Sequence, residues 1–179
     1  ASPAVVATYS IAEQLYKAMQ SAISPLSAAV YPYMSKEKDI ELMLKLICGC
    51  VLLVTIGAVF GYFISPILLD FFFDESWKSS LSILNIFFIA VVIHAGAVMT
   101  GYPLAAAVGR LDVANSSVVT GALIYGIGIL ALFIVGQVTP TMLAGLMVVA
   151  EISVLIHRVS ILLPLAKRKS QIADILSGD

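Results

Sequence analysis

Long apolar runs are the feature that most constrains this chain. Five stretches, at about residues 5–33, 42–69, 80–107, 113–138 and 139–166, each reach the roughly 20 mostly apolar residues that a helix needs to cross a bilayer. Backbone N–H and C=O groups in lipid must be satisfied within their own segment, and no period-two strand pattern stands out. The sequence therefore predicts an all-α integral membrane protein with about five transmembrane helices.

The composition and the placement of charge support this prediction. The chain is 60% hydrophobic and only 12% charged, and its net charge of −1 gives no reason to expect a nucleic-acid partner. With five spans, seven of the basic residues fall on one side of the membrane: Lys36, Lys38, Lys45, Arg110, Lys167, Arg168 and Lys169. Because basic residues concentrate in cytoplasmic loops, we expect the tail at 167–179 to be cytoplasmic. The start at Ala1-Ser2-Pro3, directly before an apolar stretch, suggests the C-terminal part of a longer protein.

The first stretch differs from the others because it carries a polar stripe. On a helix, its polar residues fall within one arc of about 140°: Glu13, Gln14, Lys17, Gln20, Ser21, Ser24 and Ser27. Such a stripe faces a protein interior or a water-filled cavity, and Glu13 is the expected local partner of Lys17. We expect a cavity-lining helix. A helix lying on the membrane surface and a structural bundle helix with a satisfied polar stripe are the alternatives.

Two further spans carry ionisable groups near their middle. Glu151 has no cation within one turn, so it is protonated, paired across helices or facing a hydrated cavity. We regard Glu151 as a candidate site for a coupling ion or a proton, with a packing role as the alternative. His94 is a second candidate, or a bundle histidine bonded to a neighbour. Arg158 is interpreted as a side chain that extends to the lipid headgroups.

Three residues predict irregular points in the helices. Pro25 should kink the first span, and Gly101 with Pro103 should break or kink the third. Ser80 and Thr139 are the expected N-caps of the third and fifth spans. The sequence shows no catalytic residue set and predicts no metal or cofactor site, so we do not expect an enzyme.

The first stretch also carries a family resemblance. The run YSIAEQLYKAMQSAISPLSAAVYPYMS resembles a recurring segment of bacterial oligosaccharide-lipid flippases, which belong to the multidrug/oligosaccharidyl-lipid/polysaccharide exporter superfamily. The runs SLSILNIFFI, VGRLD and AGLMVVAEISVLI are similar to later segments of the same family. The resemblance implies two six-helix bundles around a central cavity that opens to each side in turn. The five spans would then be the last five of the second bundle.

The function implied by this resemblance is the flipping of a polyprenyl-pyrophosphate-linked oligosaccharide, such as an O-antigen repeat unit of lipopolysaccharide, across the bacterial inner membrane. Lys17, beside Glu13, would bind phosphate, while Gln14, Gln20, Ser21 and Ser24 would bind glycan hydroxyls. Pro25, Gly101 and Pro103 would be hinges. The expected partners are the lipid-linked oligosaccharide, membrane lipids and the polysaccharide polymerase machinery. Another exporter of the superfamily, a membrane-embedded glycosyl or acyl transferase, and a structural membrane subunit remain alternatives.

Overall fold

The computed structural model of the chain describes residues 3–72 and 78–177 and shows a bundle of long helices. Its helices are α1 (Pro3–Glu37), α2 (Ile40–Phe72), α3 (Lys78–Thr100), α4 (Tyr102–Val108), α5 (Leu111–Val135) and α6 (Pro140–Ser177). Short connections separate them, and no strand occurs among the described residues. Most of the expected connection between the second and third spans, at 73–77, lies outside the described residues. The architecture confirms the predicted all-α membrane protein.

Local chemistry explains several of the helix ends. The Asp39 carboxylate accepts a hydrogen bond from the backbone N–H of Leu42 at 2.9 Å and caps α2. The Thr139 hydroxyl accepts one from the N–H of Met142 at 3.3 Å, which confirms the expected N-cap of α6. Gly136 ends α5 with a positive φ of 72° that favours glycine. Ser80 does not cap α3, because the helix already begins at Lys78.

The predicted break is found in the third span, whereas Pro25 of the first span lies inside a continuous helix. α3 ends at Thr100 and α4 starts at Tyr102, so the break at Gly101 is confirmed. In contrast, α1 continues as one helix through Pro25. The last helix also runs beyond the apolar stretch that was expected to end near residue 166. There, the Lys169 ammonium donates to the carbonyl of Val108 at 2.9 Å and holds the extension against the end of α4.

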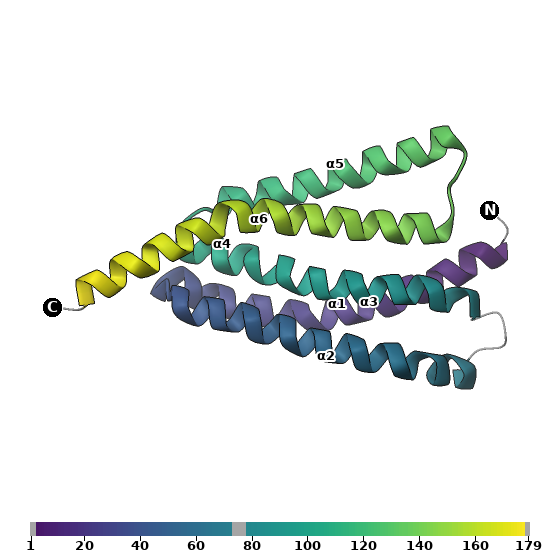
Figure 1. The fold of residues 1–179 in the computed structure, drawn as a ribbon, viewed down its shortest axis with the longest axis horizontal. Coiled ribbons are helices and arrows are strands. Elements are labelled where there is room, and N and C mark those ends of the chain that lie inside the picture. The colour runs from purple at the N-terminus through teal and green to yellow at the C-terminus, as the bar shows by residue number, and fades with distance from the viewer. Residues whose placement is uncertain (1–2, 73–77, 178–179) are drawn as a thin grey trace.

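The centre of the bundle is α3, which packs against α1, α2 and α6, while α5 packs against α6 and α4 (Figure 1). Large side chains fill the contacts around α3. The fully buried Tyr16 ring of α1 stacks on Phe87 of α3, with ring centroids 4.7 Å apart and an angle of 12° between planes. Burying two aromatic rings in this way stabilises the α1–α3 contact beyond the area that it covers.

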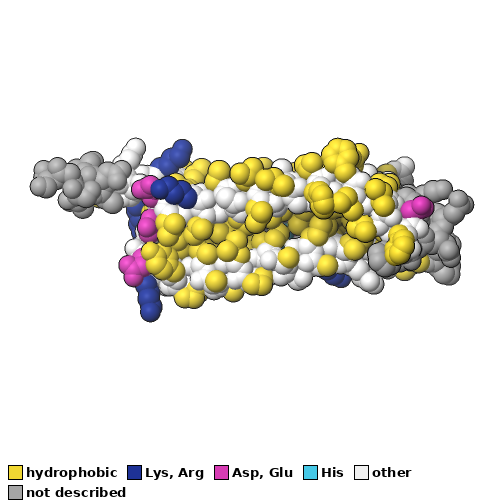
Figure 2. Space-filling model, turned by 90° about the horizontal axis from the view of Figure 1, so that it is seen from below, with side chains coloured by type: hydrophobic (Ala, Val, Ile, Leu, Met, Phe, Trp, Pro, Cys, Tyr) yellow, Lys and Arg dark blue, Asp and Glu magenta, His cyan; other side chains and the backbone are white. Residues whose placement is uncertain are grey.

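Within residues 3–72 and 78–177, four segments are long and apolar enough to cross a membrane: α2, α3 together with α4, α5, and α6 up to Ile172. α1, with 35 residues, is as long as these segments, but its polar stripe keeps it out of this set. Figure 2 shows apolar side chains along the length of the bundle and charged ones gathered mainly at its ends. Strongly exposed apolar residues, such as Leu53 and Phe63 on α2 and Ile134 on α5, form a surface suited to lipid. The chain is therefore a multi-pass membrane protein.

The two ends of the bundle differ in charge. The α1–α2 and α4–α5 connections and the C-terminal part of α6 lie at one end, and the α5–α6 connection lies at the other (Figure 1). The first end therefore carries the seven basic residues named above. The opposite end has a single basic residue, Lys78. This is the asymmetry expected of a protein with a fixed orientation in its membrane.

We predict that single cysteines at Lys36, Arg110 and Lys167, in a Cys48→Ala, Cys50→Ala background, will all be shielded from an impermeant thiol reagent added outside intact cells. A cysteine at Gln137, in the α5–α6 connection, should react. Permeabilising the cells should make all four positions reactive, which controls for local burial. Labelling of position 36 together with position 137 in intact cells would contradict the arrangement of the bundle across the membrane.

Candidate functional site

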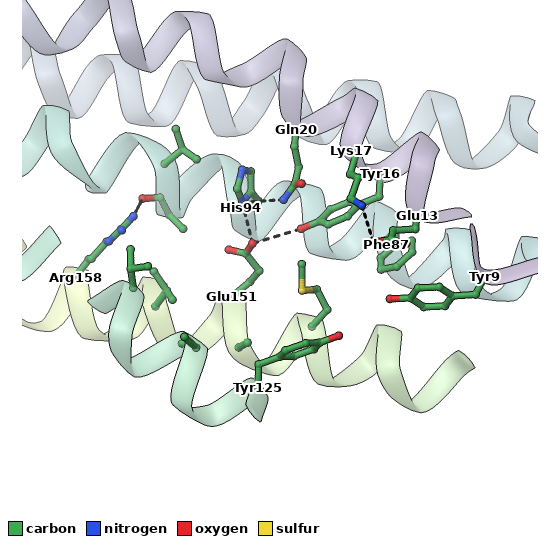
Figure 3. Close-up of a pocket in the computed structure, with 18 residues that line it drawn as sticks. Tyr9, Glu13, Tyr16, Lys17, Gln20, Phe87, His94, Tyr125, Glu151 and Arg158 are labelled. Carbon is green, nitrogen blue, oxygen red and sulfur yellow. Dashed lines mark hydrogen bonds and ion pairs between the residues drawn. The ribbon is translucent and has the colours of Figure 1, made fainter. Parts of the chain in front are cut away.

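A cavity of about 530 Å³ lies between α1, α3, α5 and α6. Its walls are mostly apolar, and a limited set of polar side chains enters it from all four helices. These polar residues are Tyr9, Glu13, Tyr16, Lys17, Gln20, His94, Tyr125, Glu151 and Arg158 (Figure 3). Five of them, Glu13, Lys17, His94, Glu151 and Arg158, carry or can acquire a charge. A cavity of this size and character is the usual form of a ligand-binding site.

The lysine of α1 is paired as expected. Lys17 Nζ lies 2.8 Å from Glu13 Oε1, one helical turn earlier. The Lys17 side chain is nevertheless 66% exposed, and that of Glu13 is 35% exposed. Glu13 therefore neutralises the ammonium without covering it. The lysine still has N–H donors available to a ligand, because an ammonium carries three and the carboxylate occupies one side of it.

Glu151 is paired across helices. Its Oε1 atom, on α6, lies 2.9 Å from Nδ1 of His94 on α3, and the two side chains are only 15% and 19% exposed. Both residues line the cavity. Of the three possibilities derived from the sequence, two therefore hold together: Glu151 is bonded to another helix and also faces a cavity. His94 has the neighbour that was expected of a bundle histidine.

Two side chains of α1 complete this polar cluster. The Tyr16 hydroxyl donates to Glu151 Oε1 at 3.4 Å, and Gln20 Nε2 lies 3.3 Å from His94 Nδ1. Figure 3 shows all four side chains converging at the middle of the cavity. α1 thus makes polar contacts with both α3 and α6 at one level, through residues one helical turn apart. We refer to Tyr16, Gln20, His94 and Glu151 as the central cluster.

The structure separates the substrate-binding residues predicted on α1 into two groups. Glu13, Lys17 and Gln20 line the cavity, whereas Gln14, Ser21 and Ser24 are exposed and lie outside its lining. The two serines also bond to their own helix, because Ser21 Oγ donates to the carbonyl of Ala18 and Ser24 Oγ to that of Gln20. The arc of polar residues predicted on α1 is therefore wider than the part of this helix that faces the cavity.

The interpretation of Arg158 as a headgroup-seeking side chain is wrong, because this residue is only 6% exposed. Its Nε donates to Ser117 Oγ at 2.7 Å, its Nη2 to the carbonyl of Ala114 at 3.3 Å, and its Nη1 to the carbonyl of Ala97. The guanidinium therefore joins α3, α5 and α6. Its planar guanidinium carries donors on three separate nitrogens and reaches acceptors on two other helices, a spread that the compact ammonium of a lysine does not match.

The break after α3 explains why an arginine is needed there. The N–H of Gly101 bonds to the carbonyl of Val98 at 3.1 Å, rather than to Ala97 as in a regular helix. Without Arg158, the carbonyl of Ala97 would lose its usual backbone partner and keep only a bond from the Thr100 hydroxyl at 3.3 Å. A Cβ at position 101 would lie 2.7 Å from Nη1 of Arg158, so glycine is also required for the close approach. The predicted hinge is thus bridged by Arg158.

Tyrosines are the cavity residues that the sequence interpretation missed. Tyr9 and Tyr16 lie on the same stripe of α1 as Glu13 and Gln20, at helical spacings of four and seven. They were left out because a tyrosine in an apolar run does not count as polar in such a pattern. Tyr125 comes from α5 and points toward Tyr9 across the cavity (Figure 3). The helical spacing could have revealed the first two, but only the packing of α5 reveals the third.

The chemistry of the cavity suits a ligand that carries negative charge and hydroxyl groups. Lys17 offers a cationic donor, Gln20 an amide, and Tyr9 and Tyr125 offer hydroxyls and ring faces. Within residues 3–72 and 78–177, no three His, Cys, Asp or Glu side chains come together as a metal site. No protein-family model matches the chain, and no curated protein or solved structure is significantly similar to it. The resemblance to flippases therefore stays a prediction.

Arg158→Ala is predicted to destabilise the folded protein. The change removes three buried hydrogen bonds that join α6 to α3 and α5, at a cost of about 1 kcal/mol for each bond. The carbonyl of Ala97 keeps only the bond from the Thr100 hydroxyl, and that of Ala114 keeps the bond from the Ser117 hydroxyl. Arg158→Lys should be intermediate. The apparent melting temperature in detergent measures the effect, and Arg168→Ala, which removes an exposed arginine of the same helix, is the matched control. Equal melting temperatures for Arg158→Ala and Arg168→Ala would refute the bridging role.

Proposed function

We propose that this chain forms part of a transporter that flips a polyprenyl-pyrophosphate-linked oligosaccharide from the cytoplasmic to the external leaflet of a bacterial inner membrane. The observation that carries the proposal is a polar cavity inside an apolar helical bundle, with an accessible ammonium group on its wall. A pyrophosphate and a glycan cannot cross hydrocarbon unaided, because each charged or hydroxyl group would lose its water. A protein cavity that replaces this water removes the main barrier.

Different residues of the cavity wall suit the pyrophosphate and the glycan of such a substrate. Lys17 supplies a charge-assisted donor for phosphate oxygens, and its neighbour Glu13 limits the cost of keeping the charge in the membrane. Gln20 can bond to sugar hydroxyls, while the rings of Tyr9 and Tyr125 offer apolar faces for sugar rings. The polyprenyl chain stays against the lipid-facing surface.

The outer side of α1 also supports a larger assembly around the cavity. Gln14 is exposed on this helix, and lipid would leave its amide group without a partner. This side is therefore expected to face water or further protein, as it would in a two-bundle exporter. In this proposal Pro25, Gly101 and Pro103 act as hinges while the cavity opens to each side in turn. The charge asymmetry supports a cytoplasmic C-terminus.

An exporter of cationic solutes is the second candidate, because Glu13 and Glu151 place two carboxylates in the same cavity. A cationic solute would bind these groups and be repelled by Lys17. The sign of the effect of removing Lys17 therefore separates the two functions. In either case Glu151, with His94, is our candidate for the group that binds a coupling ion.

Lys17→Ala is predicted to weaken the binding and slow the flipping of lipid-linked oligosaccharide in vesicles. The affinity should fall about tenfold. This is the lower end of the effect of losing a charge-assisted hydrogen bond, because the Lys17 side chain is largely exposed. Lys45→Ala is the matched control, since Lys45 also pairs with an acid one turn earlier but lies outside the cavity. Faster transport of a cationic dye by Lys17→Ala, with unchanged flipping of the lipid, would favour the exporter of cationic solutes.

A double substitution separates phosphate binding from simple charge neutralisation. If Lys17 serves only to neutralise Glu13, then Glu13→Gln should restore activity to Lys17→Ala. If the ammonium binds the substrate, the double variant should stay defective although it accumulates and folds normally. Restored flipping in the double variant would therefore remove the main support for the proposed function.

A further inference from the structure

The bonding around His94 Nδ1 constrains the protonation of the central cluster. This nitrogen lies 2.9 Å from Glu151 Oε1 and 3.3 Å from Gln20 Nε2. A ring nitrogen either carries one hydrogen or presents one lone pair, and an amide nitrogen can only donate. A hydrogen bond from Gln20 therefore requires Nδ1 to be unprotonated. In that case Glu151 itself must carry a proton, since two acceptors at 2.9 Å would repel each other.

We propose that Glu151 and His94 form a binding site for a single proton, and that its uptake transfers the attachment of α1 from Tyr16 to Gln20. Without this proton, Nδ1–H of His94 and the Tyr16 hydroxyl both donate to the Glu151 carboxylate, and Gln20 faces an N–H. The incoming proton enters at Nε2 of His94, and the Nδ1 proton crosses to Glu151 Oε1. The single lone pair of Nδ1 is then shared between the Glu151 carboxyl, at the shorter distance, and the Gln20 amide, at the longer one.

This transfer moves the strongest polar contact of α1 from Tyr16, at one end of a helical turn, to Gln20 at the other end. A bond from Tyr16 to a carboxylate is charge-assisted, and it weakens when the acceptor becomes a neutral carboxyl. At the same time the Gln20 amide gains an acceptor that it lacked. The strongest polar attachment of α1 thus moves by four residues, or about 6 Å along the helix. Lys17 lies between these two points, so the proton and the ligand-binding lysine act on the same turn.

The proton site is the group that sets the net charge of the cavity, because the neighbouring charges balance one another. Several charged or titratable groups face it from the four helices that surround the cavity: Tyr9, Glu13, Tyr16 and Lys17 on α1, His94 on α3, Tyr125 on α5 and Arg158 on α6. Glu13 and Lys17 pair with each other, and Arg158 and Glu151 carry opposite charges. The cavity is therefore neutral before proton uptake and has one positive charge after it, which favours an anionic ligand. By linkage, anion binding also favours proton uptake.

The geometry favours a proton over a metal cation as the ligand of this site. A sodium or divalent ion needs several oxygen ligands, and the group directly facing Glu151 Oε1 is a ring nitrogen at 2.9 Å. A second carboxylate is not part of the central cluster, because Glu13 is bonded to Lys17. A proton needs only the two atoms that are already in hydrogen-bond contact.

The proton site is testable without any substrate. Spin labels at Ser21 on α1 and Ile156 on α6, both exposed, would report their separation by pulsed electron resonance between pH 5 and pH 9. The full chain, with Cys48 and Cys50 replaced by alanine, would be used in lipid nanodiscs. We expect two distance populations that exchange with a single midpoint, and loss of this pH dependence in Glu151→Gln. A distance that does not change with pH would overturn the proposal.

Two further variants give opposite predictions. Tyr16→Phe removes a donor to the carboxylate, so it destabilises the deprotonated form and should move the midpoint to higher pH. Gln20→Leu removes the bond made only by the protonated form and should move the midpoint to lower pH. Each shift should be about half to one pH unit, and Gln14→Leu, on the outer side of α1, should cause none. Shifts in the same direction, in variants with normal melting temperatures, would refute the transfer from Tyr16 to Gln20.

The link to anion binding rests on the proposed function and is measured separately. Geranylgeranyl pyrophosphate serves as the probe, and its dissociation constant is measured at pH 6 and pH 8 for the parent protein and for Glu151→Gln. The variant is the control, because any titration of the probe itself affects both proteins equally. The parent should gain about tenfold more affinity on acidification than Glu151→Gln, as expected for one charge acting over about 12 Å at an effective dielectric constant of about 20. Equal pH responses together with an intact distance change would reject the anionic substrate and retain the proton site.

Discussion

The low tolerance of lipid for polar groups determines how this bundle is arranged. Every charged or amide side chain that lies at membrane depth must find a partner or water, because hydrocarbon supplies neither. α2 and α5 meet the requirement by exposing mainly apolar residues, whereas α1 carries a full polar stripe. One part of this stripe faces the cavity, where Glu13 pairs with Lys17 and Gln20 contacts His94. The cavity therefore exists where the polar stripe of α1 meets the ionisable groups of α3 and α6.

Much of the fold could be predicted because membrane helices are encoded locally. Runs of about 20 apolar residues, the Thr139 cap and the break at Gly101 each depend on a few neighbouring residues, and the structure confirms them. The predictions were less accurate where a helix continues beyond its apolar segment. α6 extends past the apolar stretch to Ser177, because this extension depends on a contact with the end of α4 that the sequence pattern does not express.

The candidate site was predictable only in part, since its residues come from four helices. The stripe on α1 correctly placed Glu13, Lys17 and Gln20 together, and the mid-span position of Glu151 indicated a group in need of a partner. Which partner it has depends on how α3 packs against α6, and that register cannot be deduced from either helix alone. Arg158 was misplaced for a related reason. An arginine near the end of an apolar run usually reaches the membrane surface, but here the broken end of α3 offers it buried acceptors.

Two kinds of polar contact divide the bundle into a fixed and an adjustable part. Arg158 keeps its charge at any physiological pH, so its bonds to α3 and α5 hold these helices against α6 under all conditions. The contacts of α1 with the same helices depend instead on a carboxyl, an imidazole, a phenol and an amide, whose donor and acceptor roles change with one proton. A helix held in this way can shift while the others stay in place. Since α1 also carries Lys17, the helix with the adjustable contacts is the one that bears the exposed ammonium of the cavity.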